Sequence, residues 1–487
     1  MQTTLVAKQT INIVWFKRDL RLSDHEPLSL AEAAGIPVLL LYVFEPLLLK
    51  DPHYSQRHWR FITQSLKDMN GQLCKKISVA HGELVSIFKQ ISSIYTIDSV
   101  FSYQETGLVN SFDRDKALRL WVDEHAIRWY ESARDAVVRP CSNRDLWDNY
   151  WQRVMRADQI VNQIDTLDLL MLKFDTSGLS DNWKDQDPFM QRGGAIEANK
   201  VLSDFFVERG KGYHKLISKP LDSQVSCSRI SPYLAWGNIS LRQVYQHLLG
   251  HWSRKGWRKP LTGLSSRLHW HCHFIQKFES EHRMEFEAIN RGYYTFPYRC
   301  DAGSESDLIA WSKGATGYPL VDACMRCLLK TGYINFRMRA MLVSFLCHHL
   351  NIDWRRGVAH LASVFLDFEP GIHYAQFQMQ AGITGINTIR IYNPTKQAKE
   401  QDTQGLFIKQ WCPELADLPT QILFEPWMIT PLEELMYNLI IGRDYPSPIV
   451  DMKISYRQAS DRLWAWRDRP DVRKESRRIL RKHVRSS

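Results

Sequence analysis

The stretch TGYPLVDACMRCLLKTGYINFRMRAMLVSFLC, Thr316–Cys347, carries the clearest structural signal in this chain. Apolar residues recur at helical spacing over Leu320–Lys330 and again over Phe336–Leu350, and a glycine separates the two runs. This spacing predicts two helices joined by a short turn. Further segments with the same spacing extend the helical region over residues 193–487; they are Ala195–Arg209, Ser240–Leu249 and Ser265–Phe278.

Residues 1–135 show a different pattern, in which short apolar, β-branched runs alternate with helical spacing. The predicted strands are Ile11–Phe16, Pro37–Phe44, Ile77–His81, Ser99–Gln104 and Ile127–Glu131. The predicted helices between them are Pro27–Ala34, Gln56–Leu73, Leu84–Ile91 and Ser111–Glu124. This alternation predicts βαβ units and a parallel sheet covered on both faces. Residues 136–192 are polar and irregular, which predicts a surface connection with one or two helices.

Composition places the chain among globular proteins, with 44% apolar and 24% charged residues. Its nine cysteines are too sparse for a disulfide scaffold, so we expect free thiols. The longest apolar run, Ile36–Phe44, is too short to span a bilayer, and the opening MQTTLVAKQT lacks the apolar stretch of a signal peptide. We therefore expect a cytoplasmic protein without membrane association.

The net charge of +10 and the 17 tryptophans suggest a polyanion and stacking surfaces, although a large aromatic core would need the same residues. Half of the excess charge lies in residues 471–487, whose net charge is +5. A run of this kind is typical of a solvated helix face, and the alternative is a nonspecific phosphate contact.

Two arginines at the start of the second predicted helix of Thr316–Cys347 need anionic partners. Arg337 and Arg339 lie two residues apart beside an apolar surface, and buried guanidinium groups need carboxylate or phosphate partners. The segment LDFEPGIHY supplies Asp367 and Glu369. An Arg–Asp pair beside a planar cofactor would be functional, whereas a structural salt bridge is the alternative.

Two further segments contain candidate ligands. In SCSRISPYLAWGNIS, Ser226–Ser240, the hydroxyls of Ser228 and Ser231 precede a helix and could hold a phosphate or simply cap it. In RLHWHCHF, Arg267–Phe274, two histidines four residues apart have zinc spacing, but a polar helix lining a cleft explains them equally. Because no second ligand pair stands at fixed spacing, and the CxxC of the long stretch lies within a helix, we predict no metal site.

Taken in order along the chain, several motifs resemble those of the photolyase/cryptochrome family. They are WFKRDLRLSDHEPL at Trp15–Leu28, Thr316–Asp322, Asn351–Arg355, Asn393–Leu415, Glu425–Trp427 and YPSPIVD at Tyr445–Asp451. The resemblance covers nearly the whole chain. It implies a doubly wound, Rossmann-like α/β antenna domain (1–135), an interdomain connection (136–192) and a larger all-α domain (193–487) that binds FAD and DNA and ends in the basic tail.

The resemblance also assigns residues to FAD. The positions that match the family's cofactor contacts are Tyr213, Cys227, Ser228, Arg229, Ile230, Ser231, His271, Arg339, Asp367 and Glu369. Three of them depart from the family pattern: Cys227 replaces a threonine, His271 an arginine near the phosphates, and Glu369 an aspartate. His373 stands where an asparagine or aspartate usually faces flavin N5.

Other matching positions concern the DNA lesion and the electron path. The lesion-binding positions are Arg267, Trp270, Arg337, Met341 and Met379. Arg267 replaces a glutamate and Met379 a tryptophan of the family pattern. Of the family's three relay tryptophans only Trp354 matches, because the other two positions are Asp301 and Phe377. The sequence therefore does not determine the electron-relay route. The aromatic residues that could replace the missing tryptophans are Trp270, Tyr333, Tyr374 and Tyr392.

The function that the resemblance implies is light-driven splitting of cyclobutane pyrimidine dimers in DNA by reduced FAD, with Trp270, Arg337, Trp354 and His373 as the catalytic set. The segment Tyr333–Arg339 lacks the histidine pair of (6-4) photolyases, which favours cyclobutane dimers. The alternative is a cryptochrome-type photoreceptor that signals through a partner. We expect a monomer, and the antenna chromophore stays unidentified, since folate, deazaflavin, a second flavin or none would all fit.

Overall fold

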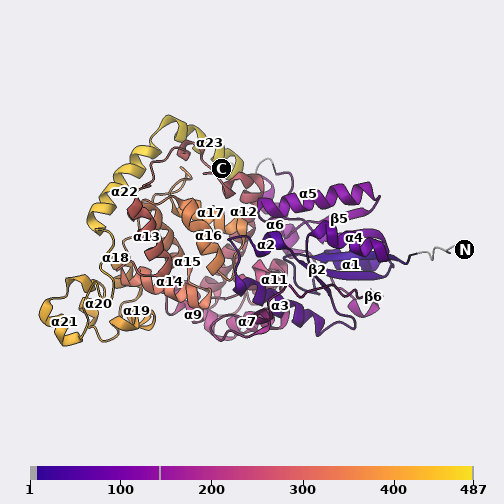
Figure 1. Ribbon diagram of the computed structural model, residues 1–487, viewed down its shortest axis with the longest axis horizontal. Coiled ribbons are helices and arrows are strands. Elements are labelled where there is room, and N and C mark those ends of the chain that lie inside the picture. The colour runs from indigo at the N-terminus through magenta and orange to yellow at the C-terminus, as the bar shows by residue number, and fades with distance from the viewer. Residues whose placement is uncertain (1–7, 142–143, 485–487) are drawn as a thin grey trace, which may run out of the picture.

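A parallel β-sheet forms the N-terminal layer of the computed structural model, which describes residues 8–141 and 144–484. Its strands are β1 (Thr10–Phe16), β2 (Val38–Phe44), β3 (Ser78–His81), β4 (Thr96–Tyr103), β5 (Arg128–Ser132) and the short β6 (Leu169–Leu170). The order is β3-β2-β1-β4-β5, with β6 also pairing β2, and every pair is parallel. The sheet lies toward the right of Figure 1 and the helical region toward the left.

Helices cover both faces of the sheet because its central strands carry apolar side chains on both faces. Alternate residues of β1 enter two separate cores: Val14 packs with α1 (Glu26–Ala33) and α3 (Gln56–Asn70), and Ile13 packs with α4 (Leu84–Ile94) and α5 (Val109–Glu124). This is the predicted doubly wound α/β arrangement. A short helix, α2 (Pro46–Leu49), follows β2.

The connection packs against the sheet and the helical region alike. It contains α6 (Trp147–Arg156) and the 3-10 turns η1 (Ile164–Thr166) and η2 (Asp181–Lys184). Trp147 and Trp151 of α6 belong to the same apolar core as β1 and the start of the helical region. The strand β6 within it was not predicted, because two leucines give no alternation that sequence could reveal.

The helical region begins at α7 and contains the two predicted helices of Thr316–Cys347. Its elements are α7 (Ala195–Val207), η3 (Arg209–Gly212), α8 (Tyr213–Leu216), α9 (Ser223–Ser226), α10 (Ser231–Ala235), α11 (Leu241–Gly250), α12 (Arg258–Ser280), η4 (His282–Glu285), η5 (Arg291–Tyr293), α13 (Ala302–Lys313), α14 (Pro319–Thr331), α15 (Phe336–Ser344), η6 (Phe345–His349), α16 (Trp354–Val364), α17 (Pro370–Gln380), α18 (Pro394–Gln401), α19 (Leu406–Trp411), η7 (Pro413–Leu415), α20 (Thr420–Leu423), η8 (Pro426–Met428), α21 (Pro431–Tyr437), α22 (Met452–Arg467) and α23 (Pro470–His483).

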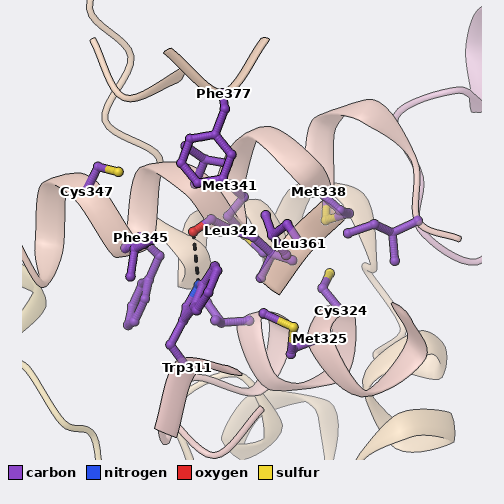
Figure 2. Close-up of a cluster of buried hydrophobic side chains, with 14 of the residues drawn as sticks. Trp311, Cys324, Met325, Met338, Met341, Leu342, Phe345, Cys347, Leu361 and Phe377 are labelled. Atoms are coloured by element: carbon purple, nitrogen blue, oxygen red, sulfur yellow. Dashed lines mark hydrogen bonds between the residues drawn. The ribbon is translucent and has the colours of Figure 1, made fainter. Parts of the chain in front are cut away.

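Helices α14 and α15 pack face to face in the largest core. Gly332 ends α14 in a left-handed conformation (φ 70°), and the Asn335 side chain accepts from the Met338 backbone N–H to begin α15. The predicted helix over 336–350 changes to a π-helix in its last turn, η6. Figure 2 shows Trp311 of α13 donating from Nε1 to the Leu342 carbonyl, 3.1 Å away, within this core.

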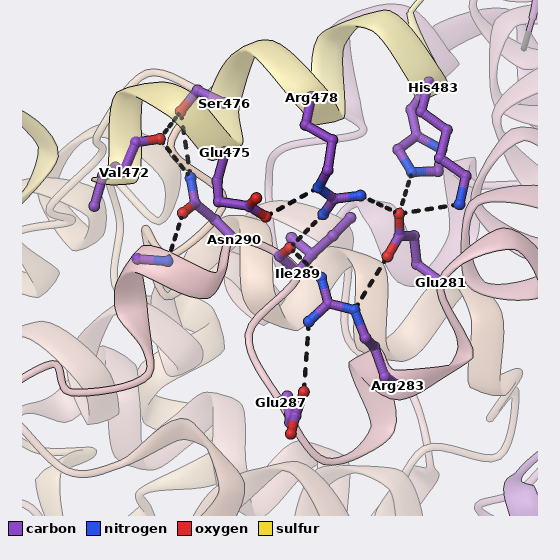
Figure 3. A network of polar contacts seen from close by, with 12 residues as sticks. Glu281, Arg283, Glu287, Ile289, Asn290, Val472, Glu475, Ser476, Arg478 and His483 are labelled. Carbon is purple, nitrogen blue, oxygen red and sulfur yellow. Dashed lines mark hydrogen bonds and ion pairs between the residues drawn. The ribbon is translucent and has the colours of Figure 1, made fainter. Parts of the chain in front are cut away.

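The basic C-terminal helix α23 is docked onto the domain. The buried Glu281 carboxylate pairs with Arg478 at 2.6 Å and with Lys482 at 3.2 Å (Figure 3). Asn290 Nδ2 donates to the Val472 carbonyl at 3.2 Å. Part of the tail's charge is therefore neutralised inside the protein. No helix of the described residues is long and apolar enough to cross a membrane.

Candidate functional site

A cavity inside the helical region gathers most of the residues that the sequence singles out. It contains about 1250 Å³ of empty space, part of it open to solvent. Its walls come from α8, the segment before α10, α12, the turn between α14 and α15, and helices α16 and α17. The predicted residues on these walls are Tyr213, Cys227, Ser228, Arg229, Ser231, Arg267, Trp270, His271, Arg339, Asp367 and His373.

The backbone of the wall segment Cys227–Ser231 is held from behind by Arg209. The Arg209 guanidinium donates to the carbonyl oxygens of Cys227 and of Ser228, the latter at 3.1 Å. This contact fixes the loop so that the Ser228 and Ser231 side chains border the cavity. Helix α10, which follows, has only five residues, so we assign no separate anion site to its end.

Arg229 takes a left-handed backbone conformation in this loop (φ 59°), which is uncommon outside glycine and asparagine. Its guanidinium stacks 3.7 Å from the centroid of the Tyr333 ring and donates from Nη2 to Gln191 Oε1 at 3.0 Å. Burial lowers the pKa of Arg229. The loop thus presents a fixed cationic plane beside an aromatic ring.

Arg339 and Asp367 form a bidentate pair on the wall. Arg339 Nη1 and Nη2 donate to the two carboxylate oxygens of Asp367 at 3.0 and 2.9 Å. Burial alone would raise the pKa of Asp367, but the Arg339 charge and its hydrogen bonds hold that pKa below its usual value. The Arg339 guanidinium also lies 4.0 Å from the Phe365 ring centroid. The pair is therefore a salt bridge whose two residues line the cavity, and its role toward a cofactor stays a prediction.

One face of α12 forms the wall nearest solvent. Spacings of three, four and seven residues from Arg267 put Trp270, His271 and Phe274 on the same face of the helix, and all four residues line the cavity. Trp270 is 42% exposed, and the Arg267 guanidinium lies 4.7 Å from its ring centroid. Burial lowers the pKa of His271, so this imidazole is neutral and offers a hydrogen bond rather than a fixed positive charge.

His373 faces the cavity from α17 with a defined tautomer. Its Nε2 lies 2.8 Å from the Val358 carbonyl oxygen, which can only accept, so Nε2 carries the proton. Burial lowers the pKa of His373 to about 3. The second ring nitrogen, Nδ1, is therefore unprotonated and can accept a hydrogen bond.

Six predicted residues lie off the cavity wall, and two of them correct the prediction. They are Ile230, Arg337, Met341, Trp354, Glu369 and Met379. Met341 is completely buried among the side chains of α14–α16 (Figure 2), so direct contact with a DNA lesion is wrong for it. Glu369 pairs with Arg134, which follows β5, at 2.8 Å and lies behind the wall, so it does not present its carboxylate to the cavity.

The remaining four take other places. Ile230 fills the core that the sheet and the helical region share, and Trp354 is buried at 1% exposure behind Phe377, which itself lines the cavity. Met379 is half-buried on α17. Arg337 points into a separate groove, where its Nη1 donates to Gln397 Oε1 at 3.2 Å.

This groove is basic and aromatic. Its charged lining residues are Arg337, Arg390, Lys396, Lys399, Lys453, Glu400 and Glu425. Its aromatic residues are Tyr392, Trp427 and Tyr456. Five cations against two carboxylates give the groove a positive field.

Sequence reasoning missed several polar residues on the cavity wall. Gln376 and Gln380 line it from α17, and Asn335 lines it from the turn before α15. A helical stripe through His373, at spacings of three, four and seven residues, would have pointed to both glutamines. No such signal marks Asn335, because its position depends on the conformation of the turn between α14 and α15.

The histidines and cysteines of the zinc hypothesis have other partners. His269 Nε2 lies 3.0 Å from Asp148 Oδ1, and its ring contacts Trp147 and Trp151 edge-on. Free thiols, as the sparse spacing predicted, occur at Cys74, Cys227, Cys272, Cys300, Cys324, Cys327, Cys347 and Cys412. Within residues 8–141 and 144–484, no cluster of three or more His, Cys, Asp or Glu side chains could hold a metal ion.

Comparison with known families identifies the chain. The family model for the FAD binding domain of DNA photolyase matches residues 264–465, and the DNA photolyase model matches residues 12–148. The chain belongs to the photolyase/cryptochrome family. The family predicted from the motifs is confirmed, and so is the predicted fold, a parallel α/β sheet region followed by a larger helical region.

The relatives of this family member carry two kinds of name. "Cryptochrome DASH" of Synechocystis is 28% identical over 90% of this chain and 95% of its own. The "Deoxyribodipyrimidine photo-lyase" of Alkalihalophilus pseudofirmus is 27% identical over 91% of this chain and 95% of its own. The crystal structure of a class III photolyase from Agrobacterium tumefaciens superposes with a TM-score of 0.82 at 25% identity, covering 96% of this chain and all of its own.

The cofactor of this photolyase/cryptochrome family member is FAD, and the cavity suits it. Aromatic and aliphatic side chains such as Phe365, Phe377 and Leu361 can enclose a flat ring system, while Arg229, Ser228 and Ser231 can bind its charged phosphates. The charge of Arg339 is already balanced by Asp367, so the guanidinium is stable in a largely apolar wall. It can therefore hydrogen-bond a polar edge of the ring system.

Proposed function

We propose that this protein is a DNA repair enzyme that uses light and FAD to split cyclobutane pyrimidine dimers. One observation carries the proposal: the FAD cavity reaches solvent at Trp270, which is 42% exposed and lies against the Arg267 guanidinium. A large exposed aromatic ring is unfavourable in water, and a flat, poorly stacked base pair is a partner that would cover it.

The basic groove around Arg337 supports a DNA partner. Its five cations suit a phosphate backbone, and Tyr392, Trp427 and Tyr456 offer surfaces for unstacked bases. Arg337 lines this groove, and its Nη1 donates to Gln397 Oε1 at 3.2 Å, which holds the guanidinium at the groove. The groove and the cavity share helix α15, which carries Arg337 on one and Arg339 on the other.

In this mechanism the protein binds and orients while the cofactor supplies the redox chemistry. Bound, reduced FAD supplies the electron that light transfers to the dimer. Trp270 packs against the dimer, and Arg267 binds the adjacent phosphate. Asp367 keeps Arg339 in place, and the unprotonated His373 Nδ1 accepts a hydrogen bond from a donor in the cavity. Leu361 and Phe365 exclude water from the wall.

The test is light-driven loss of dimers from DNA. Purified, FAD-reduced protein is illuminated with single-stranded and double-stranded DNA that carries thymine dimers, and the remaining dimers are counted. We expect loss in the light and none in the dark, and we expect Trp270→Ala to repair far more slowly than Trp270→Phe. Intact DNA binding without light-dependent loss of dimers would contradict the proposal.

A blue-light photoreceptor is the second candidate, since relatives named cryptochrome DASH match this chain as closely as those named photo-lyase. It predicts a light-dependent change in the binding of a partner with no loss of dimers. We also propose the division into 1–135, 136–192 and 193–487, a monomeric state, and an antenna chromophore of undefined chemistry in the first domain.

A further inference from the structure

A buried chain of three hydrogen-bonded side chains joins the N-terminal part of the protein to α17. The Tyr374 hydroxyl lies 2.6 Å from His53 Nε2, and His53 Nδ1 lies 2.7 Å from Asp51 Oδ1. Tyr374 is 2% exposed and His53 is 9% exposed. None of the three lines the FAD cavity, so contact with the cofactor does not explain why these polar groups are buried together.

The positions of the protons follow from the partners. Burial would raise the pKa of Asp51, but hydrogen bonds from His53 and Asn110 outweigh it, and the pKa lies below its usual value. Asp51 is therefore an ionised carboxylate that only accepts, and His53 Nδ1–H donates to it. His53 Nε2 is left with its lone pair, and the Tyr374 hydroxyl donates to it.

Aromatic rings connect Tyr374 to the cavity. The Tyr374 ring meets Trp354 edge-on, with 6.2 Å between ring centroids. Trp354 in turn lies 6.4 Å from Phe377, which lines the cavity. Trp354 is 1% exposed, so the path from Tyr374 to the cavity wall runs through side chains that water does not reach.

The chemistry of these rings differs. Tryptophan and tyrosine are the side chains most easily oxidised by one electron, whereas phenylalanine is not oxidised under these conditions, so Phe377 acts as an inert bridge. Oxidation makes a phenol strongly acidic, and in a dry site the proton needs a base within hydrogen-bond reach. Burial raises the pKa of Tyr374, which excludes the phenolate as the starting form. His53 is that base.

We propose that Tyr374, with His53 as its proton acceptor, is the electron donor that this protein uses to photoreduce FAD. Excited FAD bound in the cavity would supply the oxidising power. Trp354 would then give up one electron and Tyr374 would refill Trp354. As Tyr374 loses its electron, its O–H bond breaks and the proton moves to His53 Nε2, which gives a neutral tyrosyl radical and an imidazolium paired with Asp51.

The electron that Tyr374 gives up refills Trp354, and the ion pair between the His53 imidazolium and the Asp51 carboxylate holds the proton nearby. A thiol in solution then donates one electron to the tyrosyl radical, and His53 returns the proton. This step rests on bound FAD but not on DNA repair, so it would serve a repair enzyme and a photoreceptor equally.

The experiment illuminates the FAD-loaded, oxidised protein without DNA and records electron paramagnetic resonance and transient absorption spectra. We expect a neutral tyrosyl radical, identified by the spectral narrowing that ring-deuterated tyrosine causes. The radical disappears in Tyr374→Phe, which keeps the ring. In His53→Gln, whose amide oxygen still accepts the hydrogen bond but is not a base, the radical forms about 10²-fold more slowly.

The matched control is Tyr437→Phe at the end of α21, which removes a hydroxyl from another half-buried tyrosine and leaves the radical unchanged. Flavin content and melting temperature of each variant show that FAD is bound and the chain folded; if Tyr374→Phe does not fold, fluorinated tyrosine in the wild type shifts the radical spectrum instead. An absent tyrosyl radical in the wild type, the same radical in Tyr374→Phe, or an unchanged rate in His53→Gln overturns the proposal.

Discussion

Two carboxylates that stand two residues apart in LDFEPGIHY serve different partners. Asp367 pairs with Arg339 on the cavity wall, and Glu369 pairs behind it with Arg134 of the N-terminal α/β part. The residue types alone offered both carboxylates as partners for the arginines, and the resemblance to the family singled out the Arg339–Asp367 pair. The sequence could not predict that Glu369 turns toward Arg134, because the two are far apart in the chain and neither shows any pattern that links them.

Replacing Asp367 by Asn leaves the Arg339 guanidinium unpaired in a largely buried wall. We expect a loss of about 3 kcal/mol in the free energy of unfolding at neutral pH and faster loss of FAD. Because the pKa of Asp367 is lower in the folded chain, its contribution is present above the unfolded pKa and is lost as the pH falls through the folded pKa. Urea titration measures this loss, which should shrink toward acid pH.

The control is Asp113→Asn on α5, where the ion pair with Lys116 is exposed and should contribute little. Equal stability of wild type and Asp367→Asn at neutral pH would show that the wall pair is not a stabilising contact.

At the scale of elements, local signals predicted the strands closely and some helices poorly. Helix α12 begins at Arg258 rather than at the predicted Ser265. Pro260 suggests a break, yet proline fits the first turn of a helix, where its missing N–H has no partner to lose. The π-helix η6 and the strand β6 were missed because both depend on packing against distant residues rather than on local propensity.

Helix α23 depends on Glu281, whose carboxylate is 5% exposed and faces several cations (Figure 3). Burial would raise the pKa of Glu281, but hydrogen bonds and charges from His483, Arg478 and Lys482 lower it far more. Glu281→Gln should therefore release α23 and speed amide exchange over residues 470–483. Hydrogen–deuterium exchange measures this change.

The matched control for Glu281 is Asp471→Asn, which breaks an exposed pair between the first turn of α23 and Arg469, the residue just before the helix. Its exchange should stay close to that of the wild type. If Glu281→Gln leaves α23 as protected as before, the apolar contacts of Val472 and Ile479 hold the helix without the charge network.

At the scale of the whole molecule, the two layers meet through polar contacts that sequence patterns do not reveal. His53 reaches Tyr374, Arg134 reaches Glu369, and Arg18 donates to the Phe368 carbonyl. Each layer was predictable alone, because periodicity is a local property of the chain. The contacts between the two layers were not predictable, because their partners lie far apart in the chain. The two-domain prediction therefore contains none of these contacts.

Buried neutral histidines should make the whole fold sensitive to acid. Burial lowers the pKa of six of them to between about 3 and 4; they are His58, His273, His348, His349, His373 and His483. Since the unfolded chain binds these protons near pH 6.5, stability should fall as the pH drops from about 6.5 toward 4, by up to about 1.4 kcal/mol per unit for each group.

Glu45 acts in the opposite sense. Burial raises the pKa of Glu45 to about 7, so the stability that its protonated form contributes is lost as the pH rises from about 4.5 to 7. This single group offsets only part of the opposite effect of the six histidines. Urea titration between pH 5 and 7 measures the slope, which His348→Gln should reduce by about 1.4 kcal/mol per unit. A flat profile would mean that these histidines take up protons without unfolding the chain.

The central claim is that one cavity holds FAD and receives the DNA lesion at Trp270. The most direct test is the absorption spectrum of bound, reduced FAD during titration with DNA that contains one thymine dimer, beside the same DNA without it. The account predicts a spectral change that saturates with dimer-containing DNA, is absent with undamaged DNA, and is lost in Trp270→Ala. Tight binding of damaged DNA that leaves the flavin spectrum unchanged would contradict it.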